Sequence, residues 1–404
     1  MKTVRISRAV RAMNILLFII ALAFKGVVDG LVIQNDPNGP LNLAKYIVLI
    51  ICILVYSYEI HLGYRASGRS IFVNEFQTLM IMMAGIVLIS TVRSVIASEF
   101  TIETVKEYAY WIIPILFSFC ALNIFSLQDL QICAKAAIVI LGVSYVLQIG
   151  ISTFSLHNII DTITHMTLSG GDNSSSKSIF ESNSFPDSFM SLFFFFSYFK
   201  KKNYRWLWIS FLLVTLANKR LMIVFSIITL IVIFLPKLNL KQPRILLQHL
   251  WLVMATLFLA MPFLVMYSMK VDVEFQILLK TGINMPNFWM GRDVMVNHIV
   301  QSSFQSFGLG STFPFQGSLL EVEGVKIYLE IGMVGLVLVV FSYWRIVRKN
   351  YFCMLIMTYN FININTSTSI STGTFSWIFY LILIGVCLYY KQNYSPVYNS
   401  SATP

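Results

Sequence analysis

Charge is scarce in this chain of 404 residues: Asp, Glu, Lys and Arg together make up 12% of it, whereas hydrophobic residues make up 57%. The mean hydropathy is +0.74, a value that the core of a water-soluble domain does not need. The 5 cysteines include no CxxC pair and no Cys/His spacing typical of zinc. These features argue against a disulfide framework and a zinc domain, and they favour a membrane protein.

Several motifs of soluble enzymes are also missing. The chain has no Walker lysine motif, no dinucleotide-binding glycine fingerprint and no GxSxG elbow. No basic run is interleaved with base-stacking aromatic residues, so the net charge of +11 does not indicate nucleic-acid binding. We therefore expect no nucleic acid, no cofactor and no metal, and substrates that the membrane delivers.

Long apolar runs recur along the whole chain. Because a helix needs roughly 20 apolar residues to cross a bilayer, these runs predict about twelve transmembrane helices. We expect the first to be retained, since it is too long for a signal peptide and has no small-residue cleavage site. The sequence thus predicts an all-α, polytopic membrane bundle in which residues 1–404 form a single domain. The predicted spans are 12–33, 42–58, 74–91, 108–125, 130–152, 187–199, 206–217, 221–236, 250–269, 324–343, 351–367 and 373–390.

The clusters of Lys and Arg predict the orientation. With twelve spans counted, all of them fall on one side, which the positive-inside rule assigns to the cytoplasm together with both termini. Most acidic residues then face outward. The basic excess therefore indicates topology and a contact with anionic membrane lipid. The clusters are Lys2/Arg5/Arg8/Arg11, Arg65/Arg69, Lys200–Lys202/Arg205, Lys237/Lys241/Arg244 and Arg345/Arg348/Lys349.

Two polar loops fall on the outward side. Residues 153–187 form one, which is partly of low complexity. Residues 270–323 form the longer one, and because polytopic proteins keep most connections short, we expect function there. From Arg292 to Phe307 this loop has the periodicity of an amphipathic lid helix, which Gly308 and Gly310 are expected to end.

Titratable residues of the longer loop are candidates for chemistry. Helical phase turns Arg292 toward the bundle, where a guanidinium is suited to bind phosphate. His298 falls on the polar face, as a solvated histidine or a catalytic base. Glu321 and Glu323 stand just before the next span, either as candidates for a general base or as a solvated acidic turn.

Other ionisable residues lie in or between the spans. Lys219 and Arg220 form an outward-facing doublet, which either binds a lipid phosphate or pyrophosphate or reaches to lipid headgroups. Lys25 is followed by Asp29, and Lys326 by Glu330, each at a spacing of four. This spacing predicts one ion pair on the face of each helix. The pairs are Lys25–Asp29 and Lys326–Glu330.

Many spans, a large outer loop late in the chain and a following helix with a Glu-x-Gly-x-x-Gly signature together resemble a known family. It comprises the bacterial O-antigen and capsule polysaccharide polymerases (Wzy-type) and the related O-antigen ligases. Residues 328–335, Tyr-Leu-Glu-Ile-Gly-Met-Val-Gly, carry the signature, and fifteen residues separate Arg292 from Gly308 in the loop. Residues 218–220, Asn-Lys-Arg, stand where the family shows a Ser-Arg-Gly-like step. The resemblance covers residues 175–335.

The resemblance implies a metal-independent, GT-C-like glycosyltransferase at the outer face of the bacterial cytoplasmic (inner) membrane. It would transfer a growing chain between undecaprenyl-pyrophosphate-linked oligosaccharides, with a chain-length regulator and a flippase as partners in the pathway. The implied roles are donor pyrophosphate binding for Lys219, Arg220 and Arg292, deprotonation of the acceptor hydroxyl for Glu321, Glu323 or His298, and a structural role for Gly308, Gly310, Glu330 and Gly332.

Two departures from the family pattern leave alternatives open. Glu321-Val322 stands where the ligases carry a His-Asn pair, and the loop before Asp187 has no arginine, with Lys177 as the nearest counterpart. The first departure disfavours an O-antigen ligase. A repeat-unit flippase fits the many spans, although the sequence lacks the two similar halves expected of such a transporter. A non-enzymatic assembly factor is the remaining alternative.

Overall fold

In the computed structural model of the chain, the described residues form helices joined by turns and irregular segments, and no strand occurs among them, as the sequence predicts. The described residues are 8–32, 40–66, 70–155, 157–158, 160, 180, 182, 184–235, 249–282, 284–366, 370 and 373–389.

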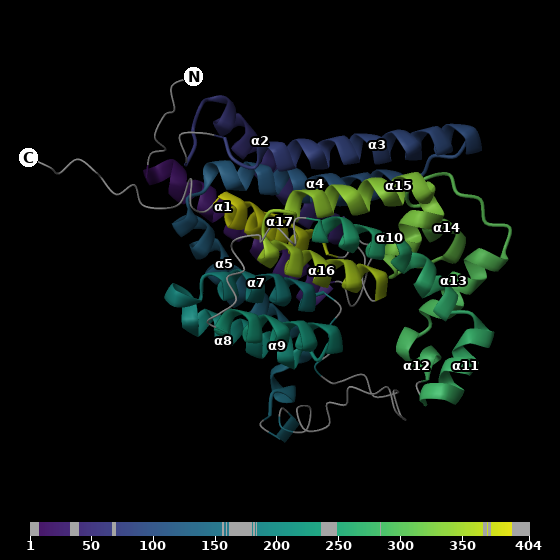
Figure 1. Cartoon of the computed structure of the whole chain (residues 1–404). Coiled ribbons are helices and arrows are strands. Elements are labelled where there is room, and N and C mark those ends of the chain that lie inside the picture. Colours follow the sequence, from purple (N-terminus) through teal and green to yellow (C-terminus); the bar gives the residue numbers. More distant parts are fainter. Residues whose placement is uncertain are drawn as a thin grey trace, which may run out of the picture.

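Each predicted span coincides with a helix (Figure 1). These helices are α1 (Arg8–Val27) with its π-helical continuation η1 (Val28–Val32), α2 (Pro40–His61), α3 (Val73–Ala97), α4 (Ile102–Ile124), α5 (Leu127–Ile149) followed by the short η2 (Ile151–Thr153), α7 (Pro186–Tyr198), α8 (Lys200–Leu216), α9 (Arg220–Phe234), α10 (Leu250–Ser268), α15 (Glu323–Val347), α16 (Tyr351–Thr366) and α17 (Thr374–Tyr389). The longer polar loop, residues 270–323, contains four short helices: α11 (Val271–Thr281), α12 (Met285–Trp289), α13 (Arg292–Gln301) and α14 (Thr312–Gln316).

Among the described residues, 7 helices are long and apolar enough to cross a membrane, and they suggest a membrane protein. They are α1, α2, α3, α4, α5, α10 and α15. The other helices that coincide with predicted spans, α7, α8, α9, α16 and α17, have 13, 17, 15, 16 and 16 residues. At 1.5 Å per residue they reach about 20–26 Å, which is short of a hydrocarbon core of roughly 30 Å.

Apolar side chains lie on the outside of the bundle as well as in its centre. All residues of α17 from Thr374 to Cys387 are buried, and this helix packs against α4, α7 and α16 (Figure 1). In contrast, α3 exposes Ile81, Leu88 and Val95, whose exposed fractions are 70%, 65% and 72%. Large bare apolar surfaces are rare on proteins that face water. The pattern therefore suits a bundle surrounded by lipid.

Contacts between helix ends define two ends of the bundle. Asn14, near the start of α1, donates to Glu59 near the end of α2 over 2.6 Å. At the opposite end, Lys45 of α2 pairs with Asp29 of η1 over 2.7 Å. The short helices α11 to α14 gather at this second end (Figure 1). We call it the loop end, meaning the end that contains Asp29, Lys45 and helices α11 to α14.

Some predictions fall outside the described residues. They concern the cations Lys2, Arg5 and Arg69 and the segment 236–248 with its basic cluster. Most of the loop 153–187, including Lys177, also lies outside them. The orientation of the bundle, the compartment on each side and the location of the termini therefore stay predictions.

Helix α1 approaches α5 closely because the facing residues of α1 are glycines. A Cβ atom on Gly26 would lie 2.4 Å from Ser144 Oγ, and one on Gly30 would lie 3.1 Å from the Ser144 carbonyl oxygen. The two glycines are four residues apart and so share one face, a spacing that lets helices in membranes pack closely. This contact fixes η1, and with it Asp29, against the bundle.

We expect Gly26→Ala to destabilise the protein by about 1–3 kcal/mol, because the new methyl group overpacks the contact with Ser144. Adding Ser144→Ala removes the obstructing Oγ and should recover most of that loss. Thermal unfolding of the single and double variants in detergent micelles measures both effects. A double variant that is no more stable than Gly26→Ala would show that the contact does not limit packing.

Candidate functional site

Helix α15 is interrupted at Gly332, inside the Glu-x-Gly-x-x-Gly signature. Gly332 has φ 73° and ψ −172°, a backbone region that essentially only glycine occupies. Next to this interruption, the carbonyl oxygen of Glu330 accepts hydrogen bonds from Arg93 Nη1 at 2.9 Å and from Ser306 Oγ at 2.5 Å. A Cβ atom on Gly332 would lie 2.7 Å from Arg93 Nη2. Glycine is thus needed here both for the backbone and for the space that Arg93 fills.

The side chain of Glu330 binds the outer loop. Its buried carboxylate accepts hydrogen bonds from the amide of Gly310 at 2.9 Å, from the amide of Thr312 at 3.0 Å and from Thr312 Oγ1 at 2.6 Å. The predicted Lys326–Glu330 ion pair is therefore wrong, because Lys326 pairs instead with Glu107, 219 positions away. Glu330 fastens the loop and the start of α14 to α15.

The predicted helix from Arg292 to Phe307 is shorter than expected. Helix α13 ends at Gln301, because Ser302 has an extended backbone. The Ser302 hydroxyl donates to the carbonyl of Ile299 at 2.8 Å and accepts from the amide of Phe304 at 3.2 Å. A serine that binds the neighbouring backbone in this way competes with continuation of the helix.

Gly308 and Gly310 do not end that helix, contrary to expectation, but form a turn between α3 and α4. Their φ angles are 113° and 84°. A Cβ atom on Gly308 would lie 2.4 Å from Ser90 Oγ, and one on Gly310 would lie 2.9 Å from the carbonyl carbon of Glu103. The amide of Leu309 donates to Ser90 Oγ at 2.9 Å. The glycines therefore let the loop backbone enter a narrow space between two helices.

Arg292 and Glu321, two of the predicted site residues, contact each other directly. Arg292 Nη2 lies 2.6 Å from Glu321 Oε2, and its Nη1 donates to the carbonyl of Trp289 at 3.3 Å. The Nε of Arg292 is buried and has no hydrogen-bond partner among the described residues. The Arg292 side chain is 15% exposed and that of Glu321 is 42% exposed. We call Arg292 and Glu321 the rim pair, because they lie at the accessible edge of the loop.

The remaining loop and doublet candidates lie apart from the rim pair. His298 is exposed, and its Nδ1 lies 2.9 Å from Gln316 Oε1. Lys219 and Arg220 stand between α8 and α9. Within the described part of the chain, no ion pair or hydrogen bond joins their side chains to Arg292 or to another residue. The three cations predicted to bind pyrophosphate are thus not brought into contact there.

A second set of ionisable side chains lies buried between α4 and α15. Lys326 Nζ lies 2.6 Å from Glu107 Oε1 and 3.9 Å from Glu323 Oε1. The other oxygen of Glu323 accepts from the amide of Ile370 at 3.2 Å. Glu107, Glu323 and Lys326 are at most 5% exposed, and we call them the α4–α15 cluster. Glu323 therefore differs from Glu321, its predicted alternative as a base, in being sealed from solvent.

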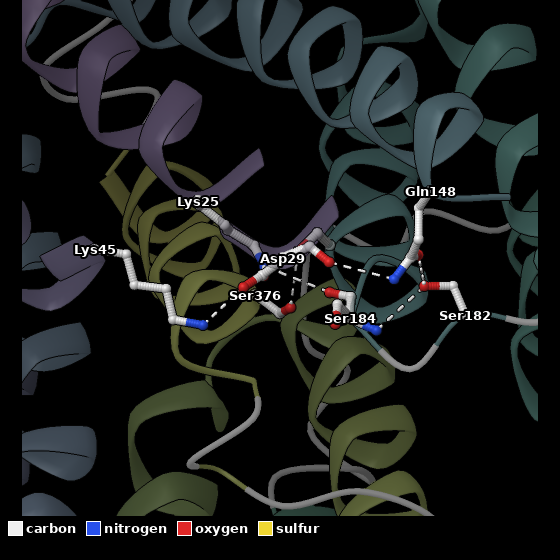
Figure 2. Close-up of polar contacts among 8 residues, drawn as sticks. Lys25, Asp29, Lys45, Gln148, Ser182, Ser184 and Ser376 are labelled. Carbon is white, nitrogen blue, oxygen red and sulfur yellow. Dashed lines mark hydrogen bonds and ion pairs between the residues drawn. The ribbon is translucent and has the colours of Figure 1, made fainter. Parts of the chain in front are cut away.

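A third set lies where η1 meets α2 and α5. Figure 2 shows Asp29 between Lys25 and Lys45; the predicted Lys25–Asp29 pair is confirmed, and Lys45 joins it at 2.7 Å. Gln148 of α5 donates to the Asp29 carbonyl at 3.2 Å and accepts from Ser182 Oγ at 2.7 Å (Figure 2). We call Lys25, Asp29 and Lys45 the α1–α2 cluster. It ties the first two helices to the entry of α7.

Two tyrosines connect the clusters. The rings of Tyr46, next to Lys45, and Tyr110, three residues after Glu107, lie 5.1 Å apart. Tyr46 also lies beside Thr374, at the start of α17. The α1–α2 and α4–α15 clusters therefore belong to one buried polar layer at the loop end.

Several residues of this layer were not predicted as partners. Lys45 and Arg93 carry a usable signal, because each is an ionisable residue within an apolar run. Glu107 carries none, because its partner is 219 positions away. Within the described part of the chain, no group of three or more His, Cys, Asp or Glu side chains could hold a metal ion.

Comparison with known proteins finds no relative: no family model, no curated protein and no solved structure matches the chain. The resemblance to the polysaccharide polymerases therefore rests on the sequence motifs. The chemistry of the loop end is the remaining guide to function.

Two carboxylates also face each other within the loop. Glu274 of α11 and Asp293 of α13 are each 7% exposed. One oxygen of each is buried without a hydrogen-bond partner among the described residues. Burial raises the pKa of Glu274, and the negative charge of Asp293 raises this pKa further. The arrangement thus favours a protonated Glu274.

We expect Glu330→Ala to release the loop, because it leaves the amides of Gly310 and Thr312 buried without a partner. Hydrogen bonds to a charged group contribute about 1.5–3 kcal/mol each, so exchange of these two amides should accelerate at least roughly tenfold. Hydrogen–deuterium exchange measures this, with the exposed Glu99→Ala as the control. Unchanged protection in Glu330→Ala would mean that other contacts hold the turn.

The stability of the loop should also depend on pH through Glu274. Since its folded pKa is raised, the contribution of Glu274 is fully present below its unfolded pKa of about 4.3 and is lost as pH rises through the folded value. Glu274→Gln should therefore increase amide protection of α11 at neutral pH but not at acid pH. The exposed Asp272→Asn is the control. Equal protection of Glu274→Gln and the unchanged chain at neutral pH would refute the pairing.

Proposed function

We propose that this chain polymerises undecaprenyl-pyrophosphate-linked oligosaccharide repeat units into O-antigen or capsular polysaccharide, at the outer face of the bacterial cytoplasmic membrane. The rim pair carries the proposal. It places Arg292, a cation suited to pyrophosphate, beside Glu321, a carboxylate suited to accept a proton. The loop that holds both is fastened to α15 at the signature that resembles the polymerases.

The rim pair can couple donor binding to release of a base. The pyrophosphate of the donor replaces Glu321 as the partner of Arg292, whose partnerless Nε offers a further donor. The freed Glu321 then takes the proton of the acceptor hydroxyl. The hydroxyl oxygen bonds to the anomeric carbon of the donor sugar, and the bond from this carbon to the pyrophosphate oxygen breaks. The pyrophosphate leaves with the electron pair, and Arg292 stabilises its charge.

The proposal also gives roles to the other predicted site residues. Lys219 and Arg220 would contact a second phosphate of a lipid carrier, which their freedom from other partners among the described residues allows. His298 keeps its role as an alternative base, whereas Glu323, the other residue predicted for this role, is sealed from solvent. Gly308 and Gly310 shape the loop turn that the mechanism needs.

The proposed function includes more membrane spans than the seven long apolar helices. It comprises about twelve spans in a GT-C-like bundle, both termini in the cytoplasm and loop 270–323 outside. The coincidence of every predicted span with a helix supports it. The short helices α7 and α17 are mostly surrounded by protein, so they need less lipid-matched length.

A repeat-unit flippase is the second candidate, and the α1–α2 cluster favours it. Buried ionisable side chains inside a membrane bundle often mark the path of a transported substrate or proton. Lys25, Asp29 and Lys45 are at most 7% exposed and lie far along the chain from the outer loop. An O-antigen ligase stays the third candidate, with Glu321-Val322 in place of the His-Asn pair of that family.

Gel analysis of surface glycolipid from a deletion strain separates these functions. Loss of a polymerase leaves a single repeat on the lipid, loss of a flippase leaves none displayed, and loss of a ligase leaves polymer unattached. We expect the deletion to leave single-repeat glycolipid. A strain with attached, full-length polymer would rule the proposed function out.

Complementation with variants then tests the rim pair. Arg292→Ala should reduce the long bands at least about 100-fold, because it removes a charge contact to the leaving group. Arg292→Lys should recover part of them, and Glu103→Gln, away from the rim, should leave the ladder normal. If Arg292→Ala and Arg220→Ala both gave a normal ladder, the pyrophosphate assignment would be wrong.

A further inference from the structure

Three buried acceptor atoms of the α4–α15 cluster and its neighbour lack a donor. They are Glu107 Oε2, Glu323 Oε1 and Asn365 Oδ1, and none accepts a hydrogen bond from a described residue. The three residues are 5%, 0% and 1% exposed. All three atoms are acceptors, so the missing partner is a hydrogen-bond donor or a cation.

Asn365 is aimed at the start of α15. Its amide nitrogen donates to the carbonyl of Phe361 at 2.7 Å, which leaves its oxygen to point away from α16. A Cβ atom on Gly324, the residue after Glu323, would lie 1.9 Å from this oxygen. The small residue at 324 therefore lets the amide oxygen reach the backbone beside Glu323.

The charges of the cluster do not balance if every carboxylate is ionised. Lys326 supplies one positive charge, and its close partner is Glu107 at 2.6 Å rather than Glu323 at 3.9 Å. Glu330 accepts three hydrogen bonds from loop donors, which suits an ionised carboxylate. An ionised Glu323 would have only the amide of Ile370 as a hydrogen-bond partner among the described residues. Burying a charge with so few partners is strongly unfavourable.

The cations nearest to the cluster are already engaged. Lys45 pairs with Asp29 at 2.7 Å, and Lys106 pairs with Glu103 at 2.7 Å. Arg93 donates to a backbone carbonyl of α15. The uncharged titratable groups beside the cluster are Tyr46 of α2 and Tyr110 of α4. None of these groups supplies the charge that Glu323 lacks.

We propose that Glu323 is a proton-binding site: its Oε1 holds one proton and donates it in a hydrogen bond to the side-chain amide oxygen (Oδ1) of Asn365, while Glu107 stays ionised against Lys326. One proton gives a hydrogen-bond partner to two of the three acceptors, Glu323 Oε1 and Asn365 Oδ1, removes the unpaired buried charge and leaves Lys326–Glu107 as a balanced pair. A metal cation in its place is disfavoured, because the Lys326 ammonium lies 3.9 Å from the same oxygen.

With this proton on Glu323, the carboxyl groups of Glu321 and Glu323 have different chemical roles. Glu323 stores a proton at rest and so is a proton donor, whereas Glu321 is the partner of Arg292 in the rim pair and has the role of the base in the proposed function. The proton on Glu323 is inferred from the acceptors that lack a donor and from the single positive charge among the carboxylates of the cluster. It holds equally for a glycosyltransferase and for a proton-coupled transporter.

Infrared spectroscopy of the full chain in lipid nanodiscs tests the site, because a protonated carboxyl has a C=O band separate from that of a carboxylate. At neutral pH we expect such a band in the unchanged protein and loss of one carboxyl's intensity in Glu323→Gln. Gln keeps the size of the side chain and can donate to Asn365 through its amide. Glu103→Gln, one turn from Glu107 on α4, is the matched control and should keep the full band.

Lys326→Met provides a second readout. Removing the ammonium leaves Glu107 without its partner, so Glu107 should take up a proton and the band should gain the intensity of one carboxyl. A band that survives intact in Glu323→Gln overturns the assignment. Absence of the band from the unchanged protein at neutral pH overturns it without any variant.

Discussion

The hydrogen bonds of Glu330 hold the loop end of this protein together. Its carboxylate binds the turn and the start of α14, and its carbonyl oxygen binds Arg93 of α3 and Ser306 of the loop. Both sets of bonds form where the interruption at Gly332 changes the course of α15. The position of the rim pair depends on this network, because both members belong to the loop and Glu321 lies two residues before the start of α15.

An apolar surrounding explains why the polar groups at the loop end are gathered in a layer. Water cannot satisfy a buried charge there, so each charge needs a protein partner. The α1–α2 cluster achieves this with two lysines on one carboxylate. In the α4–α15 cluster, Lys326 is the charged partner of Glu107, and the proton that we infer on Glu323 neutralises the second carboxylate. Solvent reaches the rim pair, in which the Glu321 side chain is 42% exposed, whereas the groups of the two clusters are sealed inside the bundle.

Features that depend on residues close together in the sequence, such as helices and short-range ion pairs, could be predicted. Apolar runs located the helices, and a spacing of four located the Lys25–Asp29 pair. The same spacing failed for Lys326 and Glu330, because the partner of Lys326 lies 219 positions away and Glu330 meets a distant loop. Helical periodicity likewise extended α13 past Ser302, whose backbone bonds end it.

The candidate site was predictable in its members but not in its arrangement. Polarity in a long outward loop pointed to Arg292 and Glu321, yet nothing local shows that they pair or that Glu323 is sealed. Arg93 and Asn365 gain their roles only where α3 and α16 meet α15. Such contacts are set by the packing of whole helices, which single-sequence patterns do not encode.

We conclude that the interruption of α15 at Gly332 fastens the loop. Hydrogen–deuterium exchange of residues 306–312 in Gly332→Ala tests this conclusion most directly. The variant removes no loop hydrogen bond itself, but an alanine does not fit φ 73° or the space beside Arg93. We predict faster exchange across this segment, and none in Gly282→Ala, a positive-φ glycine with open space around it. Unchanged exchange in Gly332→Ala would contradict the account.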